Sequence, residues 1–120
     1  MTAEAQVRVV LYHRTDDAEA LTAAYHATST AMVGVPGLLG NELLRSLTEP
    51  AEYVVTSTWA GFAAFAAWEE GPEHKAQTEP LRPFRHPATS GAFACYTTMA
   101  SYGPAPAGPV GAGRPSGASR

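Results

Sequence analysis

Apolar and polar residues alternate in four segments of the chain, and a period of two is typical of β-strands. The predicted strands cover residues 7–14, 38–46, 53–59 and 92–101. In the first strand, Val7, Val9, Leu11 and His13 fall on one face. Residues 48–52 have the length of a hairpin turn, so the second and third strands should pair antiparallel.

Between the strands, apolar residues recur every three or four positions, which predicts amphipathic helices. The predicted helices cover residues 17–32, 61–70 and 72–78. Thr15-Asp16-Asp17 offers capping oxygens to the first helix, and Val35-Pro36-Gly37 follows its end. Three prolines exclude long regular structure from residue 79 to residue 90.

The resulting order of strand, helix, strand, strand, helix, strand predicts an α+β fold of the ferredoxin-like βαββαβ type. Helices cover one face of such a sheet, yet residues of the other face, such as Val10, Leu44 and Val54, are also apolar. A second copy of the chain is the expected partner for that face, giving a homodimer in which two sheets form a barrel. We assign residues 1–102 to this domain and residues 103–120, rich in Gly, Pro, Ala and Ser, to a disordered tail.

Composition narrows the class of protein. The chain has 120 residues, 45% of them hydrophobic, and a formal net charge of -3, which fits one globular domain without a basic stripe for nucleic acid. Cys95 is the only cysteine, so we expect a small core residue rather than a disulfide or a nucleophile. The four histidines have no zinc-site spacing, and His26 and His86 are interpreted as surface residues. Without a leader or a membrane-length apolar run, a cytoplasmic location and no membrane partner are expected.

Two tryptophans flank a corner between a strand and a helix. Trp59 closes the third strand, and Phe62, Phe65 and Trp68 follow within one helix. This flat aromatic surface either fills the core or lines a slot for a planar ligand, and both interpretations remain open at this stage.

Four segments together carry a family resemblance: residues 35–46 (VPGLLGNELLRS), 53–59, 62–68 (FAAFAAW) and 71–76 (GPEHKA). Their order and spacing resemble the antibiotic biosynthesis monooxygenase family over roughly residues 7–82. The resemblance implies a dimeric α+β barrel. It also implies a monooxygenase that oxidises an aromatic polyketide-type intermediate, a phenol or an anthrone, in secondary metabolism. Such enzymes use molecular oxygen as co-substrate and need neither flavin nor metal.

The candidate catalytic residues are Trp59, His13 and His74. Trp59 resembles the strand-end tryptophan of the family, whose indole N–H can donate to a substrate oxygen. His13 and His74 are candidate bases, although each also fits a solvent-facing histidine. Phe65 stands where quinone-forming members place a tyrosine and Val55 where they place an asparagine, so two polar groups of the family are missing here.

The candidate substrate-binding residues are Asn41, Phe65, Trp68, Tyr96 and Arg82. Asn41 shares a predicted strand face with Leu39 and Leu43, so its amide either orients the substrate or is satisfied within the sheet. Arg82 could clamp an acidic substituent or lie exposed in a loop. Tyr96 could face the cavity or the dimer interface.

Two other functions compete with the oxygenase. A dimer of the same fold could bind aromatic intermediates without catalysis or act as a cyclase, which the missing polar groups favour. Haem degradation is a further alternative, because Trp68 falls where haem-degrading relatives keep a tryptophan. Their accompanying histidine would fall near Thr78, and their first-strand asparagine has no counterpart here, so haem binding is disfavoured.

Overall fold

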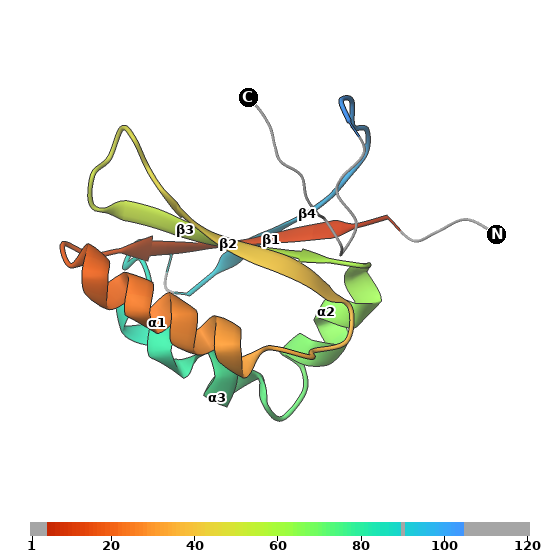
Figure 1. Cartoon of the computed structure of the whole chain (residues 1–120), viewed down its shortest axis with the longest axis horizontal. Helices are drawn as coiled ribbons and strands as arrows, with labels where there is room; N and C mark the ends of the chain where they lie inside the picture. Colours follow the sequence, from red (N-terminus) through yellow and green to blue (C-terminus); the bar gives the residue numbers. More distant parts are fainter. Residues whose placement is uncertain (1–4, 90, 105–120) are drawn as a thin grey trace.

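A four-stranded antiparallel sheet carries all the helices on one face (Figure 1). This is a computed structural model that describes residues 5–89 and 91–104. The elements in chain order are β1 (Val7–Arg14), α1 (Ala18–Ala31), β2 (Leu38–Arg45), β3 (Glu52–Trp59), α2 (Phe62–Glu69), α3 (His74–Thr78), the 3₁₀ helix η1 (Glu79–Phe84) and β4 (Phe93–Thr97). The strand order is β2-β3-β1-β4, so the predicted ferredoxin-like α+β fold is confirmed.

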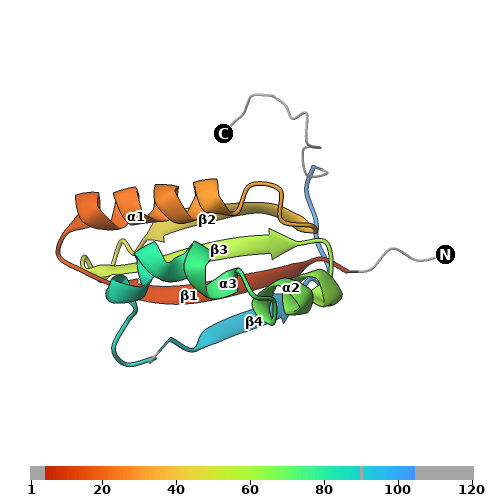
Figure 2. The ribbon, with the colours of Figure 1, turned by 90° about the horizontal axis from the view of Figure 1, so that it is seen from below.

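The sheet is built around β1 and β3. These two strands pair antiparallel along their whole length, from Val7 opposite Trp59 to Arg14 opposite Glu52. β2 pairs with β3 as predicted, and β4 forms the other edge beside β1. α1 and the segment from α2 to η1 lie side by side beneath the sheet, as Figure 2 shows from the helical side.

The first helix begins and ends at residues that the sequence marks for those roles. Asp17 caps α1 because its side-chain oxygen accepts a hydrogen bond from the backbone N–H of Ala20 at 3.0 Å. After Met32 the chain turns through Gly34 and Gly37, whose φ angles of 88° and 83° lie in the left-handed region. The carbonyl of Gly37 then accepts a hydrogen bond from the N–H of Ala60 at 2.8 Å, which ties the turn to the end of β3.

In β2, the residues that face the helices differ from the prediction. The pairing of β2 with β3 shifts between Leu38, opposite Trp59, and Gly40, opposite Thr58. This β-bulge turns Leu38 toward the core and leaves Leu39 exposed. Leu39 therefore does not share the inward face with Asn41 and Leu43.

Two further assignments were wrong. Cys95 lies opposite Val9 but belongs to the edge strand β4, and its side chain is exposed. His86 is not a free surface residue, because its Nε2 lies 3.0 Å from Oε2 of Glu52 and its side chain is 15% exposed. The predicted tail from residue 103 lies outside the described residues, except for Gly103 and Pro104.

The core consists of two separate hydrophobic clusters at opposite ends of the space between helices and sheet. The first contains Val7, Val9, Met32, Trp59 and Phe65. The second contains Leu21, Tyr53, Val55 and Leu81. Each cluster joins β1 or β3 to the helices, and the interval between the two clusters is where a site can form.

We predict that Gly37→Ala destabilises the protein more than Gly34→Ala does. Both residues have positive φ, so each substitution carries the left-handed penalty of about 1–2 kcal/mol. At Gly37 a Cβ would also overlap the Cβ of Ala64 on α2, whereas at Gly34 nothing lies within 4 Å. Overpacking should add about 1–3 kcal/mol at Gly37. Urea unfolding of both variants measures the difference, and equal losses would show that the approach of α2 to this turn is unimportant.

Candidate functional site

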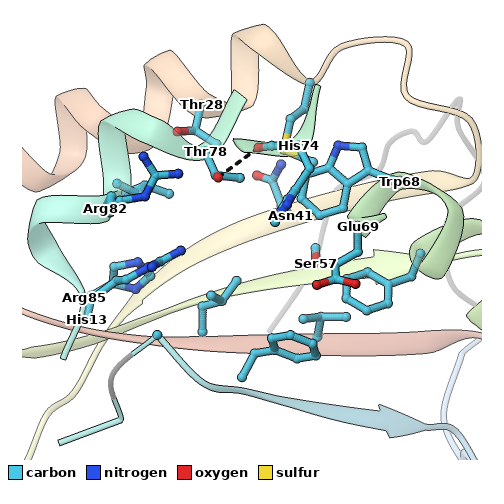
Figure 3. A pocket seen from close by; sticks show the side chains of 17 residues that line it. His13, Thr28, Asn41, Ser57, Trp68, Glu69, His74, Thr78, Arg82 and Arg85 are labelled. Carbon is cyan, nitrogen blue, oxygen red and sulfur yellow. Dashed lines mark hydrogen bonds between the residues drawn. The ribbon is translucent and has the colours of Figure 1, made fainter. Parts of the chain in front are cut away.

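A cavity of about 210 Å³ lies between the two core clusters, under the helices and against the sheet. It is larger than the roughly 150 Å³ apolar cavity that admits benzene, so a small aromatic ring system fits. Its apolar lining comes from Val9, Leu11, Met32, Phe65, Trp68, Leu81 and Phe93. Its polar lining comes from His13, Thr28, Asn41, Ser57, Glu69, His74, Thr78, Arg82 and Arg85 (Figure 3).

The cavity exists because the middle inward-facing positions are polar or small. Asn41 of β2 lies opposite Ser57 of β3, and Thr28 of α1 lines the same space. Leucine or valine at these positions would join the two hydrophobic clusters into one core. Instead, the packing is interrupted and polar atoms face the interior.

Three aromatic rings form the wall at one end of the cavity. The ring centroids of Phe65 and Trp68 are 6.2 Å apart, and those of Phe65 and Phe93 are 5.5 Å apart with a T-shaped arrangement. Such rings present faces and edges against which a planar ligand can pack.

Trp59 does not line the cavity, contrary to the prediction. Its side chain is fully buried in the first cluster, 5.6 Å from the ring centroid of Phe65 and 5.3 Å from that of Trp68. Its indole N–H donates to Oγ of Ser57 at 2.9 Å, so the donor is already used within the protein. Trp59 therefore supports the aromatic wall from the core.

Tyr96 also lies away from the cavity. It pairs with Arg8 on β1, whose side chain is on the sheet face opposite the helices, and it is 58% exposed. Alternation along β4 explains this placement, because Phe93, three residues earlier, faces the cavity.

Trp68 is held by a residue that the sequence did not single out. Its indole N–H donates to Oε1 of Gln77 at 2.6 Å, and Nε2 of Gln77 donates to the carbonyl of Ala31 at 3.1 Å. The His74 ring meets the indole edge to face, with centroids 4.6 Å apart. Gln77 thus connects the end of α1 to the aromatic wall.

Asn41 has a fixed orientation. Its Oδ1 accepts hydrogen bonds from the hydroxyls of Tyr25 and Ser29, the second at 3.2 Å. Both acceptor positions of this oxygen are therefore occupied. Within the described residues the Nδ2 amino group makes no hydrogen bond, so it remains a donor for a ligand in the cavity that Asn41 lines.

His13 is a buried imidazole on β1 with an unsatisfied atom. The side chain is 2% exposed, and its Nδ1 has no hydrogen-bond partner among the described residues. Burial lowers the pKa of His13; a backbone hydrogen bond at Leu11 opposes this effect, and the positive charge of Arg85 adds to it. His13 is therefore neutral at pH 7 and can accept a proton.

Thr28 provides a second unsatisfied atom in the same cavity. Its Oγ1 is buried without a partner in the described part of the chain, and its side chain is 5% exposed. Buried polar atoms are normally paired, so two orphans lining one cavity indicate a place for polar groups of a ligand.

His74 lies on α3 beside the aromatic wall. Burial lowers the pKa of His74, the carboxylate of Glu69 opposes this, and Arg85, Arg82 and Lys75 lower the pKa further. This second imidazole is also neutral at pH 7. Thr78, one turn later, donates its hydroxyl to the carbonyl of His74 at 2.9 Å.

Two arginines stand at the end of the cavity opposite Trp68 and Glu69, beside His13 (Figure 3). Arg82 donates to the carbonyl of Lys75 at 3.1 Å. Arg85 pairs with His13 through an isolated β-bridge between segments far apart in the sequence. No motif marks Arg85, because this pairing depends on how the chain returns after η1.

The structure thus brings six of the predicted site residues to one cavity: His13, His74, Asn41, Phe65, Trp68 and Arg82. Their roles in binding or catalysis stay predictions. In the described part of the chain, no three His, Cys, Asp or Glu side chains are arranged to hold a metal ion. Among the described helices, none has the length and apolar character needed to cross a bilayer.

Comparison with known proteins agrees with this architecture. The model of the antibiotic biosynthesis monooxygenase family matches residues 6–79. This is more than half of the chain, so the chain belongs to that family.

Two curated relatives come from Streptomyces. Protein SchA of Streptomyces halstedii is 37% identical over 82 residues, which cover 66% of this chain. The 42.8 kDa protein in the whiE locus of Streptomyces coelicolor is 35% identical over 78 residues, or 63% of this chain. The matched region spans about a fifth of each relative, 21% and 20% respectively.

Solved structures share the fold. SnoaB, described as a cofactor-independent oxygenase from Streptomyces nogalater, superposes with a TM-score of 0.66 at 17% identity, covering 82% of this chain and 97% of that one. A haem-degrading protein from Mycobacterium tuberculosis superposes with a TM-score of 0.60 at 21% identity, covering 82% and 99%. At these identities the similarity establishes the fold alone.

We predict that Gln77→Leu loosens Trp68. The substitution leaves the indole N–H without its acceptor, which should lower the free energy of unfolding by about 1–3 kcal/mol and raise the exposure of the ring. Acrylamide quenching of tryptophan emission measures this, because Trp59 is fully buried and the quenchable emission comes from Trp68. Gln77→Glu keeps the acceptor for the indole but loses the donor to the Ala31 carbonyl, so its quenching should lie between that of the wild type and that of Gln77→Leu. Equal quenching of all three proteins would contradict the role of Gln77.

Proposed function

We propose that the protein is a cofactor-independent monooxygenase that oxidises a phenol or anthrone of the aromatic polyketide type with molecular oxygen. The observation that carries the proposal is His13, a neutral buried imidazole whose Nδ1 has no partner among the described residues and which lines an aromatic cavity. Family membership and the cofactor-independent relative SnoaB add support.

In the proposed reaction, His13 first accepts a proton from the substrate. The aromatic anion packs against Phe65 and Trp68, and the free Nδ2 of Asn41 donates to its oxygen. Delocalised negative charge makes this anion a one-electron reductant for oxygen.

Oxygen takes one electron from the anion, and the resulting superoxide and substrate radical combine to form a carbon–oxygen bond. Protonated His13 returns its proton to the peroxide. Loss of water then leaves a carbonyl, so an anthrone methylene and one O₂ give a quinone carbonyl and one H₂O. The apolar wall keeps bulk water from the radical pair.

Val55 stands where the quinone-forming members place an asparagine, and Asn41 offers a replacement for that amide. Leu43 pairs with Val55 and Asn41 pairs with Ser57, so Asn41 lies on the neighbouring strand one inward-facing position away. Because Tyr25 and Ser29 hold its oxygen, its amino group serves as a preorganised donor. This observation favours the enzyme over a non-catalytic binding protein or a cyclase.

Oxygen consumption with a hydroxylated anthrone or naphthol tests the proposal. Wild-type protein should consume oxygen and form the quinone, and His13→Gln should lower kcat by about 10²–10⁴-fold. His26→Gln, on the exposed face of α1, is the matched control and should leave the rate unchanged. Because burial lowers the pKa of His13, kcat/KM should fall as the pH drops through that lowered pKa, in more acidic solution than for a solvent-exposed histidine base.

Binding of the same compounds without oxygen uptake would instead support the binding-protein alternative. Haem degradation is tested separately by a haemin titration. The histidine of the haem-degrading relatives would fall near Thr78, so no Soret shift is expected.

We further propose that the sheet face opposite the helices pairs with a second copy of the chain. Val10, Tyr12, Leu44 and Val54 supply an apolar surface on that face. The segment after β4 leaves the sheet on the same side and carries Met99 and Tyr102, both at least 90% exposed (Figure 1). A second sheet would cover this surface and leave the cavity, on the helical side, accessible.

Sedimentation analysis should give twice the mass of the chain for the wild type. Val54→Arg places a charge in the centre of the proposed interface and should yield a monomer. Ala23→Arg, on the exposed side of α1, should remain a dimer. A wild-type monomer at micromolar concentration would refute the homodimer.

A further inference from the structure

The two arginines in the cavity have no acidic partner within the described residues, where the one ion pair joins His86 and Glu52. Arg82 and Arg85 are both only partly exposed, and each keeps guanidinium N–H groups that no described residue accepts. Guanidinium groups with unused N–H donors at one end of a cavity are suited to bind an anionic group of a ligand.

Arg85 is held in place by the backbone. Gly91, with a φ of 82°, leaves the space that a side chain would fill, and Nη1 of Arg85 lies 2.9 Å from the position a Cβ would take there. The β-bridge between Arg85 and His13 fixes the base of the side chain beside β1. The side chain therefore starts from a fixed base and has room at Gly91 for its guanidinium, whose fork of N–H groups fits a carboxylate.

The opposite end of the cavity has the reverse character. Phe65, Trp68 and Phe93 present apolar rings, and the Glu69 carboxylate beside Trp68 would repel an anion (Figure 3). Charge therefore divides the cavity into an aromatic end and a cationic end, although the whole chain carries a net charge of -3.

We propose that the substrate is an aromatic acid whose carboxylate binds Arg82 and Arg85 while its ring system packs against Phe65, Trp68 and Phe93. This inference rests on the proposed function for the reaction itself, but the binding mode can be tested without turnover. Bound in this direction, the rings lie between His13 and His74, and the carboxylate fixes which ring position meets the base.

Calorimetric titration with 2-naphthoate and 2-naphthamide tests the proposal. The two ligands have nearly the same shape and differ in charge, and neither has a hydroxyl group to oxidise. Wild-type protein should prefer naphthoate by about 10- to 100-fold, the range given by hydrogen bonds to charged groups. Salt should weaken naphthoate binding and leave naphthamide binding unchanged.

Arg85→Gln removes the charge and keeps a hydrogen-bond donor. In this variant the preference for naphthoate should fall but not vanish, because Arg82 remains to bind the carboxylate. Naphthamide should bind as it does to the wild type, which also shows that the variant folds. Arg14→Gln, at an exposed position of β1, should retain the preference for naphthoate. Equal binding of both ligands to the wild type, or an unchanged preference in Arg85→Gln, would overturn the proposal.

The outcomes separate the two proposals. Oxygen uptake that is equally fast with neutral and acidic phenols would contradict the aromatic-acid substrate and still support the oxygenase function. A clear preference for naphthoate without any oxygen uptake would support the carboxylate-binding site at Arg82 and Arg85 and contradict the oxygenase function.

Discussion

The interruption of apolar packing between two hydrophobic clusters is the constraint on which the site depends. Thr28, Asn41 and Ser57 occupy inward positions where aliphatic residues would complete a single core. Two of them have a local role, because the Asn41 oxygen accepts hydrogen bonds from hydroxyls of α1 and Ser57 accepts the Trp59 N–H. Apolar packing is therefore interrupted at the centre of the domain, and the two hydrophobic clusters hold the sheet and helices together around the cavity.

The aromatic wall shows how the core and the cavity support one another. Trp59 packs against both Phe65 and Trp68, so the largest fully buried side chain also sets the position of the rings that face a ligand. Gln77 adds a hydrogen bond from the other side of Trp68. A planar ligand would therefore meet side chains that need little rearrangement.

The sequence predicts the fold well because alternation and capping are local signals. The strand Val7–Arg14 matches its predicted bounds, and Asp17 caps the helix that it was expected to begin. Periodicity identifies the face of a residue but not its depth, so Trp59 was placed at the cavity when it lies in the core. The bulge at Leu38 and the bridge from His13 to Arg85 depend on contacts between distant segments, so Leu39 was misplaced and Arg85 was missed.

The charge of the arginines affects the pKa of both groups that share the transferred proton, His13 and the substrate. Burial lowers the pKa of His13, and the positive charge of Arg85 adds a smaller shift in the same direction, so the imidazole is neutral but a weaker base. The same charge stabilises an aromatic anion and so lowers the pKa of the substrate. Because both pKa values move in the same direction, the difference between donor and acceptor does not widen as it would if the imidazole alone were shifted. Removing one guanidinium would thus disturb the donor and the acceptor together, and its effect on catalysis would be smaller than its effect on binding.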